Sequence, residues 1–350
     1  MSVFRFTIGL FIGAIVVYWI FRGTDWRAII STVHNADIDQ ILVGFVFMIC
    51  SQISRSIRWY IIVRKSFPTK FGIVYTSAQL GMLFNFLIPA RLGELIRAYL
   101  LAKGSRISAA QCLGTIMIDK IFDLIMVLLA LIFLSLFILS HGELRIPAFL
   151  TGTQSPVVIS NAVVNYVIVL IWVVLTVTIT LMALACAKAP ALNIFLNRVL
   201  SFIPDSWRKK LLNTVERIVN GLRILNSKKS LIITFFWSLL VWVFSYLAIY
   251  FMISALLGSS LMASFIVLVL VAVFIAIPIV PGVFGQYHLA VIIGLLFFYP
   301  DMPKEELRAI ALIIHFFTLF TVVSLGVGAL LRSRSSFLST LFVLSNSKRA

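Results

Sequence analysis

Residues 85–101 read Asn-Phe-Leu-Ile-Pro-Ala-Arg-Leu-Gly-Glu-Leu-Ile-Arg-Ala-Tyr-Leu-Leu, which sets two arginines, a glutamate, a proline and a glycine into apolar sequence. The chain as a whole is 61% hydrophobic. Ionisable residues at membrane depth are costly and mark functional sites by default. This stretch is therefore both a break in a membrane-embedded segment and a candidate site.

The composition places the chain in a membrane. Its mean hydropathy is +1.10, and only 12% of its residues are charged, so a soluble domain could not cover its apolar surface. Apolar runs of about 20 residues are long enough to span a bilayer. Six full spans are predicted, at residues 4–21, 40–62, 109–139, 160–187, 231–256 and 309–331.

Two apolar segments, 71–104 and 262–298, are each interrupted by a similar motif. Pro89-x-x-x-Gly93-Glu94 in the first corresponds to Pro281-x-x-x-Gly285-Gln286 in the second. The returning limbs, residues 90–103 and 284–298, would be only about 21 and 22 Å long as helices, short of a roughly 30 Å hydrocarbon core. Both segments are therefore predicted to be re-entrant hairpins.

The formal charge of +17 fits membrane orientation better than nucleic-acid binding. On the side that holds the N-terminus, the predicted spans leave 19 basic residues against two acidic ones, and on the other side five against seven. Basic residues concentrate in cytoplasmic loops. Both termini are therefore predicted to be cytoplasmic, in the inner membrane of the cell. The basic linker, 188–230, is expected to rest on anionic phospholipids.

The order of segments repeats along the chain. In residues 1–139 two spans, a hairpin at 71–104 and a span follow one another, and residues 140–350 repeat that order with the hairpin at 262–298. The first set starts inside and the second outside, which makes them inverted repeats, and such breaks point to a substrate site. The predicted fold is a single all-α polytopic domain, residues 1–350.

No cofactor is expected. Cys50, Cys112 and Cys186 lie in predicted spans without paired spacing or a histidine cluster, so they indicate neither a disulfide framework nor a zinc site. No G-x-x-x-x-G-K-[ST] motif for ATP is present. A gradient or downstream consumption of a product would have to drive any transport.

The first hairpin carries the main candidate site. Pro89 suits the first turn of a helix, so residues 90–102 are expected to form a helix whose positive end lies deep in the membrane. Arg91, Glu94 and Arg97 then share one face, and an arginine beside a helix N-terminus suits a phosphate. The alternative is that both arginines neutralise Glu94 and pin the hairpin. Asn85, and Gly93 at the break, complete the candidate set.

A second charged group lies in the span 109–139. Asp119, Lys120 and Asp123 are about 15–20 Å from its start by helical rise, and Lys120 can reach Asp123 at i, i+3. One negative charge then remains, to be met by Arg91, Arg97, Arg58, a cation or a proton. The group is either a structural lock between hairpin and span or a gating or proton-coupling element.

Two further arginines lie near the inner end of the span 40–62. Arg55 is expected to extend its charge to the cytoplasmic headgroups. Arg58, which precedes an aromatic pair, either anchors the span or contacts the ligand.

The second hairpin is almost uncharged. Pro281, Gly282 and Gly285 permit a tight bend, and Gln286 and His288 supply polar groups. His288 can titrate near neutral pH, but a lone membrane histidine is more often a hydrogen-bonded packing residue. His288 and Gln286 are included in the predicted substrate site, and packing is expected for the later His315.

Four ordered segments resemble the signatures of the flippase-like family, which includes the membrane domain of lysylphosphatidylglycerol synthases. They are Asn85-Phe-Leu-Ile-Pro-Ala-Arg-Leu-Gly-Glu-Leu-Ile-Arg-Ala, Arg55-Ser-Ile-Arg-Trp59, Asp119-Lys-Ile-Phe-Asp123 and Pro281-Gly-Val-Phe-Gly-Gln-Tyr-His. The resemblance covers nearly the whole chain. It implies a protein that moves a lipid between leaflets, with Arg91, Glu94, Arg97 and Asp123 on the family's charged positions.

The resemblance has limits. The synthases add a soluble domain that transfers lysine, and residues after the last predicted span leave no room for one here, so no synthase activity is expected. In the synthases the late motif often carries Gly-Gly and Arg-Glu, where this chain has Val283, Tyr287 and His288. That departure argues against a lysylated lipid as substrate.

The function expected from the sequence is a lipid flippase for a phosphate-bearing lipid, either a phospholipid or a polyprenyl-phosphate-linked lipid. A lipid-modifying enzyme is a candidate partner. The alternatives are a membrane-embedded glycosyl- or aminoacyl-transferase that uses Asp119 or Asp123 as its base, and a non-catalytic assembly scaffold.

Overall fold

A computed structural model describes residues 17–18, 20–87, 92–141, 144–146, 157–160, 227–276 and 283–332, together with some positions between 162 and 180. The predicted spans 4–21 and 160–187 fall largely outside this part of the chain, and the basic linker 188–230 almost entirely. So do Pro89, Arg91, Pro281 and Gly282.

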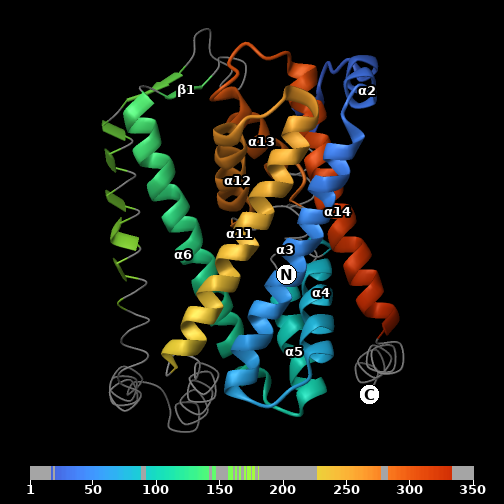
Figure 1. Cartoon of the computed structure of the whole chain (residues 1–350), viewed down its shortest axis with the longest axis vertical. Helices are drawn as coiled ribbons and strands as arrows, with labels where there is room; N and C mark the ends of the chain where they lie inside the picture. The colour runs from blue at the N-terminus through green and yellow to red at the C-terminus, as the bar shows by residue number, and fades with distance from the viewer. Residues whose placement is uncertain are drawn as a thin grey trace.

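Four long helices run through the molecule: α3 (Ile38–Ser66), α6 (Ala109–His141), α11 (Lys228–Leu257) and α14 (Lys304–Arg332). Each contains a stretch that is long and apolar enough to cross a membrane. They contain the predicted spans 40–62, 109–139, 231–256 and 309–331, which are thereby confirmed as long apolar helices. Figure 1 shows α3 and α11 side by side between α6 and α14.

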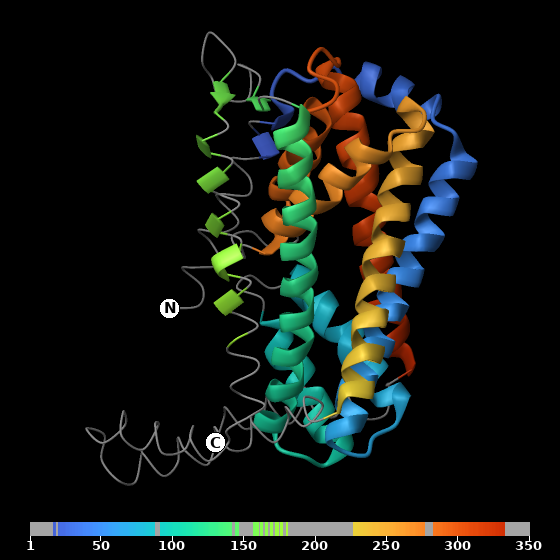
Figure 2. The same cartoon turned by 60° about the vertical axis from the view of Figure 1, so that its left-hand side comes forward.

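Four shorter helices form two pairs. α4 (Phe71–Leu87) packs against α5 (Gly93–Ser105), and α12 (Leu261–Ala276) packs against α13 (Gln286–Leu296). The first pair lies in the lower half of Figure 1 and the second in the upper half, and Figure 2 shows the same division. Both apolar segments are thus broken where the motifs predicted. Membrane depth and re-entrance stay predictions.

Both returning limbs begin later than expected. The expected first limb, 90–102, is wrong at its start: α5 begins at Gly93, and Leu92 at its N-cap makes no capping side-chain hydrogen bond. The second limb, expected from 284, begins at Gln286. Gly285 has φ +80°, a left-handed conformation open to glycine, and this conformation keeps it out of the helix.

Short elements complete the described part. α2 (Trp26–His34) lies in the predicted connector 22–39 and is capped by Asp25. The next helix, α3, is capped by Asp37, and the hydrogen bond from the Gln40 side chain lowers the pKa of Asp37. The strands β1 (Leu144–Ile146) and β2 (Val157–Ile159) pair antiparallel and were not expected from the sequence.

Small residues let α3 and α11 approach closely. A Cβ added to Gly44 would come within 2.9 Å of the carbonyl oxygen of Ala248. Two helical turns further along α3, the hydroxyl of Ser51 donates to the carbonyl oxygen of Val241 at 3.1 Å and shares a hydrogen bond with the hydroxyl of Ser245 at 2.8 Å. Small residues and hydroxyl contacts are the usual means of helix association in lipid, so this pair forms the centre of the fold.

The first helical hairpin is closed by two glycines. A Cβ on Gly93 would collide with the carbonyl oxygen of Gly81 and with the backbone and side chain of Asn85. A Cβ on Gly81 would lie 2.7 Å from the Cβ of Arg97. The contact between α4 and α5 at this level is therefore backbone against backbone, and it fixes the positions of Asn85 and Arg97.

Substituting Gly93 by alanine is expected to open this hairpin. The new methyl group meets backbone atoms, which cannot rotate away, and overpacking of this kind costs about 1–3 kcal/mol. Thermal unfolding of purified protein should show the loss. Gly328→Ala is the matched control, because nothing lies within 4 Å of its added Cβ. Equal unfolding temperatures for both variants would contradict the close packing.

Candidate functional site

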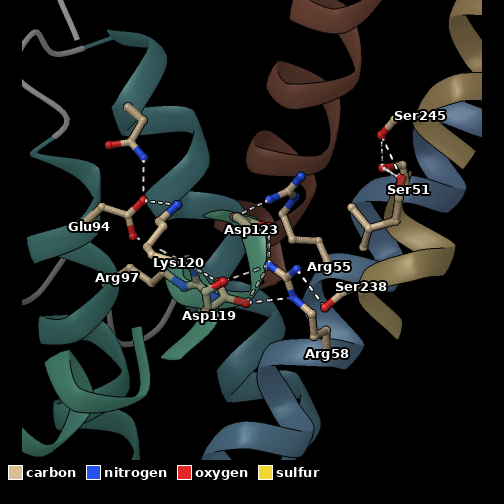
Figure 3. Close-up of polar contacts among 12 residues, drawn as sticks. Ser51, Arg55, Arg58, Glu94, Arg97, Asp119, Lys120, Asp123, Ser238 and Ser245 are labelled. Atoms are coloured by element: carbon tan, nitrogen blue, oxygen red, sulfur yellow. Dashed lines mark hydrogen bonds and ion pairs between the residues drawn. The ribbon is translucent and has the colours of Figure 1, made fainter. Parts of the chain in front are cut away.

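Seven charged side chains from three helices meet where α5, α6 and α3 pack together (Figure 3). We call this group the charged cluster; it consists of Arg55, Arg58, Glu94, Arg97, Asp119, Lys120 and Asp123.

Arg58 is the centre of the cluster. Its guanidinium lies 2.8 Å from a carboxylate oxygen of Asp119 and 2.7 Å from one of Asp123, and it also donates to Ser238 of α11 at 3.2 Å. The side chain of Arg58 is 0% exposed and that of Asp119 is 1% exposed. The sequence left two roles open for Arg58, an anchor of the span or a contact to the ligand. These contacts are those of an anchor.

Arg97 links the first hairpin to α6. Its guanidinium donates to Asp119 at 2.9 Å, and its charged carbon lies 3.6 Å from the ring centroid of Trp59. A guanidinium over an indole face gains cation–π attraction. Trp59 is itself held by a hydrogen bond from its indole N–H to Thr115 at 3.2 Å. Arg97 is therefore held in one orientation by α3 and α6 together.

The more exposed edge of the cluster is formed by two further ion pairs. Lys120 lies 2.8 Å from Glu94, with side chains 40% and 21% exposed. The expected pairing of Lys120 with Asp123 is therefore wrong, because the closing of α5 onto α6 offers a nearer carboxylate. The expected extension of Arg55 to the headgroups is also wrong, since Arg55 lies 3.0 Å from Asp123.

The charge balance of the cluster is positive. It has four cationic side chains and three carboxylates, a surplus of one positive charge among the described residues. The sequence left one negative charge of Asp119, Lys120 and Asp123 to be met by an arginine, a cation or a proton, and Arg58 and Arg97 meet it. The balance becomes positive because α3 and α5 together add three arginines and one glutamate.

A cavity lies beside the cluster. Its volume is about 20 Å³, enough for a water molecule. Most of the residues that line it have polar side chains, and they come from α3, α4, α5 and α6: Gln52, Arg55, Ser56, Ala78, Gln79, Gly81, Met82, Asn85, Glu94, Arg97 and Lys120.

Several buried polar atoms of this lining have no hydrogen-bond partner among the described residues. The donors are Nε of Arg55 and both Nε and Nη2 of Arg97, and the acceptors are Oδ1 of Asn85 and Oε2 of Glu94. Buried polar groups are normally satisfied, so these atoms mark a place where water or a ligand belongs. Asn85 and Glu94 also contact each other, at 3.3 Å.

Gln286 and His288 of the predicted site do not line this cavity. The amide of Gln286 donates to the carbonyl oxygen of Phe274 at 3.3 Å. His288 is buried against His315 of α14. The two hairpins therefore contribute different polar sites, and within the described residues no group of three candidate metal ligands is found.

Some residues of the site were not predicted from the sequence. Trp59 and Gln79 both contribute to the cluster or its cavity, and Gln79 donates to Ser56 at 2.9 Å. One signal was available for Arg55: it shares a helix face with Arg58 at i, i+3, just as Asp119 and Asp123 share one at i, i+4.

Comparison with known proteins agrees with this architecture. Two relatives from Methanocaldococcus jannaschii share local similarity: "UPF0104 membrane protein MJ1595" is 26% identical over 135 residues, 38% of each chain, and "UPF0104 membrane protein MJ1078" is 39% identical over 57 residues, 16% of this chain and 24% of the relative. The chain thus aligns with well under half of the length of either relative. No solved structure matches it.

A family model described as "Lysylphosphatidylglycerol synthase TM region" matches residues 6–326. The match includes the charged cluster, both pairs of short helices, the long helices α3, α6 and α11, and α14 up to residue 326. The chain is therefore a multi-pass membrane protein that belongs to the family of lysylphosphatidylglycerol synthase transmembrane regions.

Proposed function

We propose that the protein moves a phosphate-bearing lipid, a phospholipid or a polyprenyl-phosphate-linked lipid, between membrane leaflets. The observation that carries this proposal is the surplus positive charge of the cluster beside a cavity with unpartnered buried donors. A buried charge needs a partner, and a phosphate supplies one together with several acceptor oxygens.

The arrangement favours a phosphate over a neutral headgroup. Arg97 has two unpartnered nitrogens at the cavity, and a guanidinium fork suits phosphate oxygens. Lys120 already binds the carboxylate of Glu94, an anion that a phosphate can replace. Entry of the substrate would then release Glu94 toward Asn85 and disturb the contact between α5 and α6.

The present conformation is closed to such a substrate, because the cavity is large enough only for a water molecule. Transport requires the cavity to widen, and the short helix pairs are the elements to move. α4 ends and α5 begins at the break beside the site, whereas α3 and α6 continue past the site. We propose six full spans and two re-entrant hairpins entering from opposite faces, whose rocking exposes the cluster to each leaflet in turn.

The described charges support an orientation. The loops and helix ends at the lower end of Figure 1, as far as the structure describes them, carry basic but no acidic residues: Arg64, Lys65, Lys70, Lys103, Arg106, Lys228, Lys229 and Arg332. The upper end carries most of the acidic ones. By the positive-inside rule the lower end would face the cytoplasm, which keeps both termini and the linker 188–230 on that side of the inner membrane.

The lateral surface fits a lipid substrate. Lys120 shares a helix face with Met117 and Leu124, which are 49% and 37% exposed. At the start of α5, Leu92 of the N-cap and Leu95, which lie close to Glu94 in the sequence, are 42% and 55% exposed. A headgroup at the Lys120–Glu94 pair would therefore leave its acyl chains on apolar side chains that face the bilayer.

A reconstitution experiment tests the proposal. Purified protein in liposomes is supplied with fluorescent lipids that differ only in headgroup: a phosphatidylglycerol, a polyprenyl phosphate and a neutral diacylglycerol. We expect accelerated exchange of the two phosphate-bearing lipids and slower exchange after Lys120→Met. Lys65→Met, an exposed lysine on α3, is the control.

Other outcomes separate the alternatives. Equal acceleration of the neutral lipid would reject phosphate recognition. No acceleration by folded protein, together with wild-type behaviour of Lys120→Met in cells, would favour a scaffold.

A further inference from the structure

A second buried polar contact joins α13 to α14, apart from the charged cluster. Nε2 of His288 lies 3.2 Å from Nδ1 of His315. Both residues are 3% exposed. The rings meet edge to face with centroids 4.7 Å apart, and Phe21 packs on His288 while Phe284 packs on His315. Apolar rings thus enclose a pair of titratable groups.

The hydrogen bonds define where the protons lie. The backbone N–H of Gly285 donates to Nδ1 of His288 at 3.4 Å, so this nitrogen carries a lone pair. The proton of His288 is then on Nε2, and it is donated to Nδ1 of His315. His315 in turn carries its own proton on Nε2. Both rings are neutral in this conformation, because an imidazolium has no lone pair to accept with.

The pair holds the start of α13 against α14. Gly285 is the N-cap of α13, so its contact with His288 closes the first turn of that helix. The next residue, Tyr287, stacks on His315 with centroids 4.8 Å apart and shares a hydrogen bond with Thr318 at 3.0 Å. A change in the protonation of His288 therefore acts directly on the start of α13.

Among the described residues, few ionisable groups surround the pair. α12 has none in its sequence, and α13 offers only Tyr287 besides His288. Met48 of α3 contacts Thr318, the hydrogen-bond partner of Tyr287. On α14 the nearest charged residue in the sequence is Arg308, which pairs with Glu305 at 3.5 Å, and Glu306 lies between these two. Arg308 is seven residues from His315, about 10 Å by helical rise, and its other contact is the carbonyl oxygen of Arg22.

We propose that His288 and His315 form a binding site for one proton and that its occupation releases the start of α13 from α14. A proton added to Nδ1 of His288 breaks the contact with Gly285 and keeps the Nε2–H contact with His315. A second proton would place two imidazoliums at contact distance, where like charges repel strongly, so the pair takes one. This site goes beyond the proposed lipid function and requires no lipid to be detected.

The histidine content of the chain allows a direct test. It has four histidines, so His34→Gln with His141→Gln leaves only the pair. Nitrogen-15 spectra of imidazole-labelled protein in lipid nanodiscs should show two bare Nδ1 and two protonated Nε2 atoms at about pH 8. As the pH is lowered, we expect uptake of one proton per chain, at a more acidic pH than for an exposed histidine because burial opposes the charged form. A proton on Nδ1 of His288 at the higher pH, uptake of two protons, or no uptake would overturn the proposal.

A labelling experiment tests the coupling to the hairpin. Ala290 of α13 is 0% exposed, and Ala290→Cys is introduced after removal of the native cysteines. At the pH at which the spectra show the proton taken up, we expect its thiol to react several-fold faster than the same thiol in His288→Asn protein. The side-chain oxygen of asparagine can still accept the hydrogen bond from the backbone N–H of Gly285, but the amide does not titrate. Identical rates in the two proteins at every pH would show that protonation does not move the hairpin.

Discussion

Replacing Arg58 by methionine should remove most of the folded protein. The guanidinium of Arg58 lies 2.8 Å from the carboxylate of Asp119 and 2.7 Å from that of Asp123, and the side chain of Arg58 is not exposed to solvent. Removing one partner of a buried ion pair costs about 3–5 kcal/mol, which is a large part of the roughly 5–15 kcal/mol that stabilises a typical protein. The yield of monodisperse protein after detergent extraction and its unfolding temperature measure the loss.

Arg55→Met provides the matched control. Arg55 binds the same Asp123, but its side chain is 24% exposed, and Asp123 keeps its contact with Arg58. We expect a loss near 1 kcal/mol or less. Adding Asp119→Asn to Arg58→Met should recover part of the folded protein, because one uncompensated charge disappears. If Arg58→Met and Arg55→Met behaved alike, Arg58 would not be the anchor of the cluster.

The second large effect is expected on transport. Arg97→Met removes the surplus positive charge of the cluster and two donors at the cavity, while Asp119 keeps its pairing with Arg58. A hydrogen bond to a charged group contributes about 1.5–3 kcal/mol, so the exchange rate of a phosphate-bearing lipid should fall about 10- to 100-fold. Fluorescent-lipid exchange in proteoliposomes measures it, at a protein content matched by size-exclusion chromatography.

Two further substitutions isolate the cause. Arg97→Lys keeps the charge but loses the planar fork and its stacking on Trp59, so an intermediate rate is expected. Arg64→Met removes an exposed arginine of the same helix as Trp59 and should leave exchange unchanged. A folded Arg97→Met protein that exchanges phosphate-bearing lipid at the wild-type rate would refute this site.

Much of the candidate site was predictable as a set of residues. Arg58, Glu94, Arg97, Asp119 and Lys120 were selected because charged residues are rare in apolar segments, and each of them belongs to the charged cluster. Their partners were not predictable, since intrahelical spacing relates only residues of one helix. Lys120 was paired with Asp123 by that spacing, yet it binds Glu94.

Hydropathy and the Pro-Gly motifs by themselves determined the four described long helices and the breaks in both shorter segments. These are local properties: about 20 apolar residues make a span, and a proline or a left-handed glycine ends a helix wherever it occurs. The starts of α5 and α13 were displaced by two or three residues, because caps depend on the surrounding packing as well as on sequence.

Only the tertiary structure decided the sign of the charge balance and the contact between the two histidines. Arg58 and Asp119 are 61 residues apart in the chain, and His288 and His315 are 27 apart. Whether such groups meet depends on how separate helices pack, which is set by small contact residues such as Gly81 and Gly93. A sequence records the charges of each helix, but the net field of a buried site is a sum over all the helices that close around it.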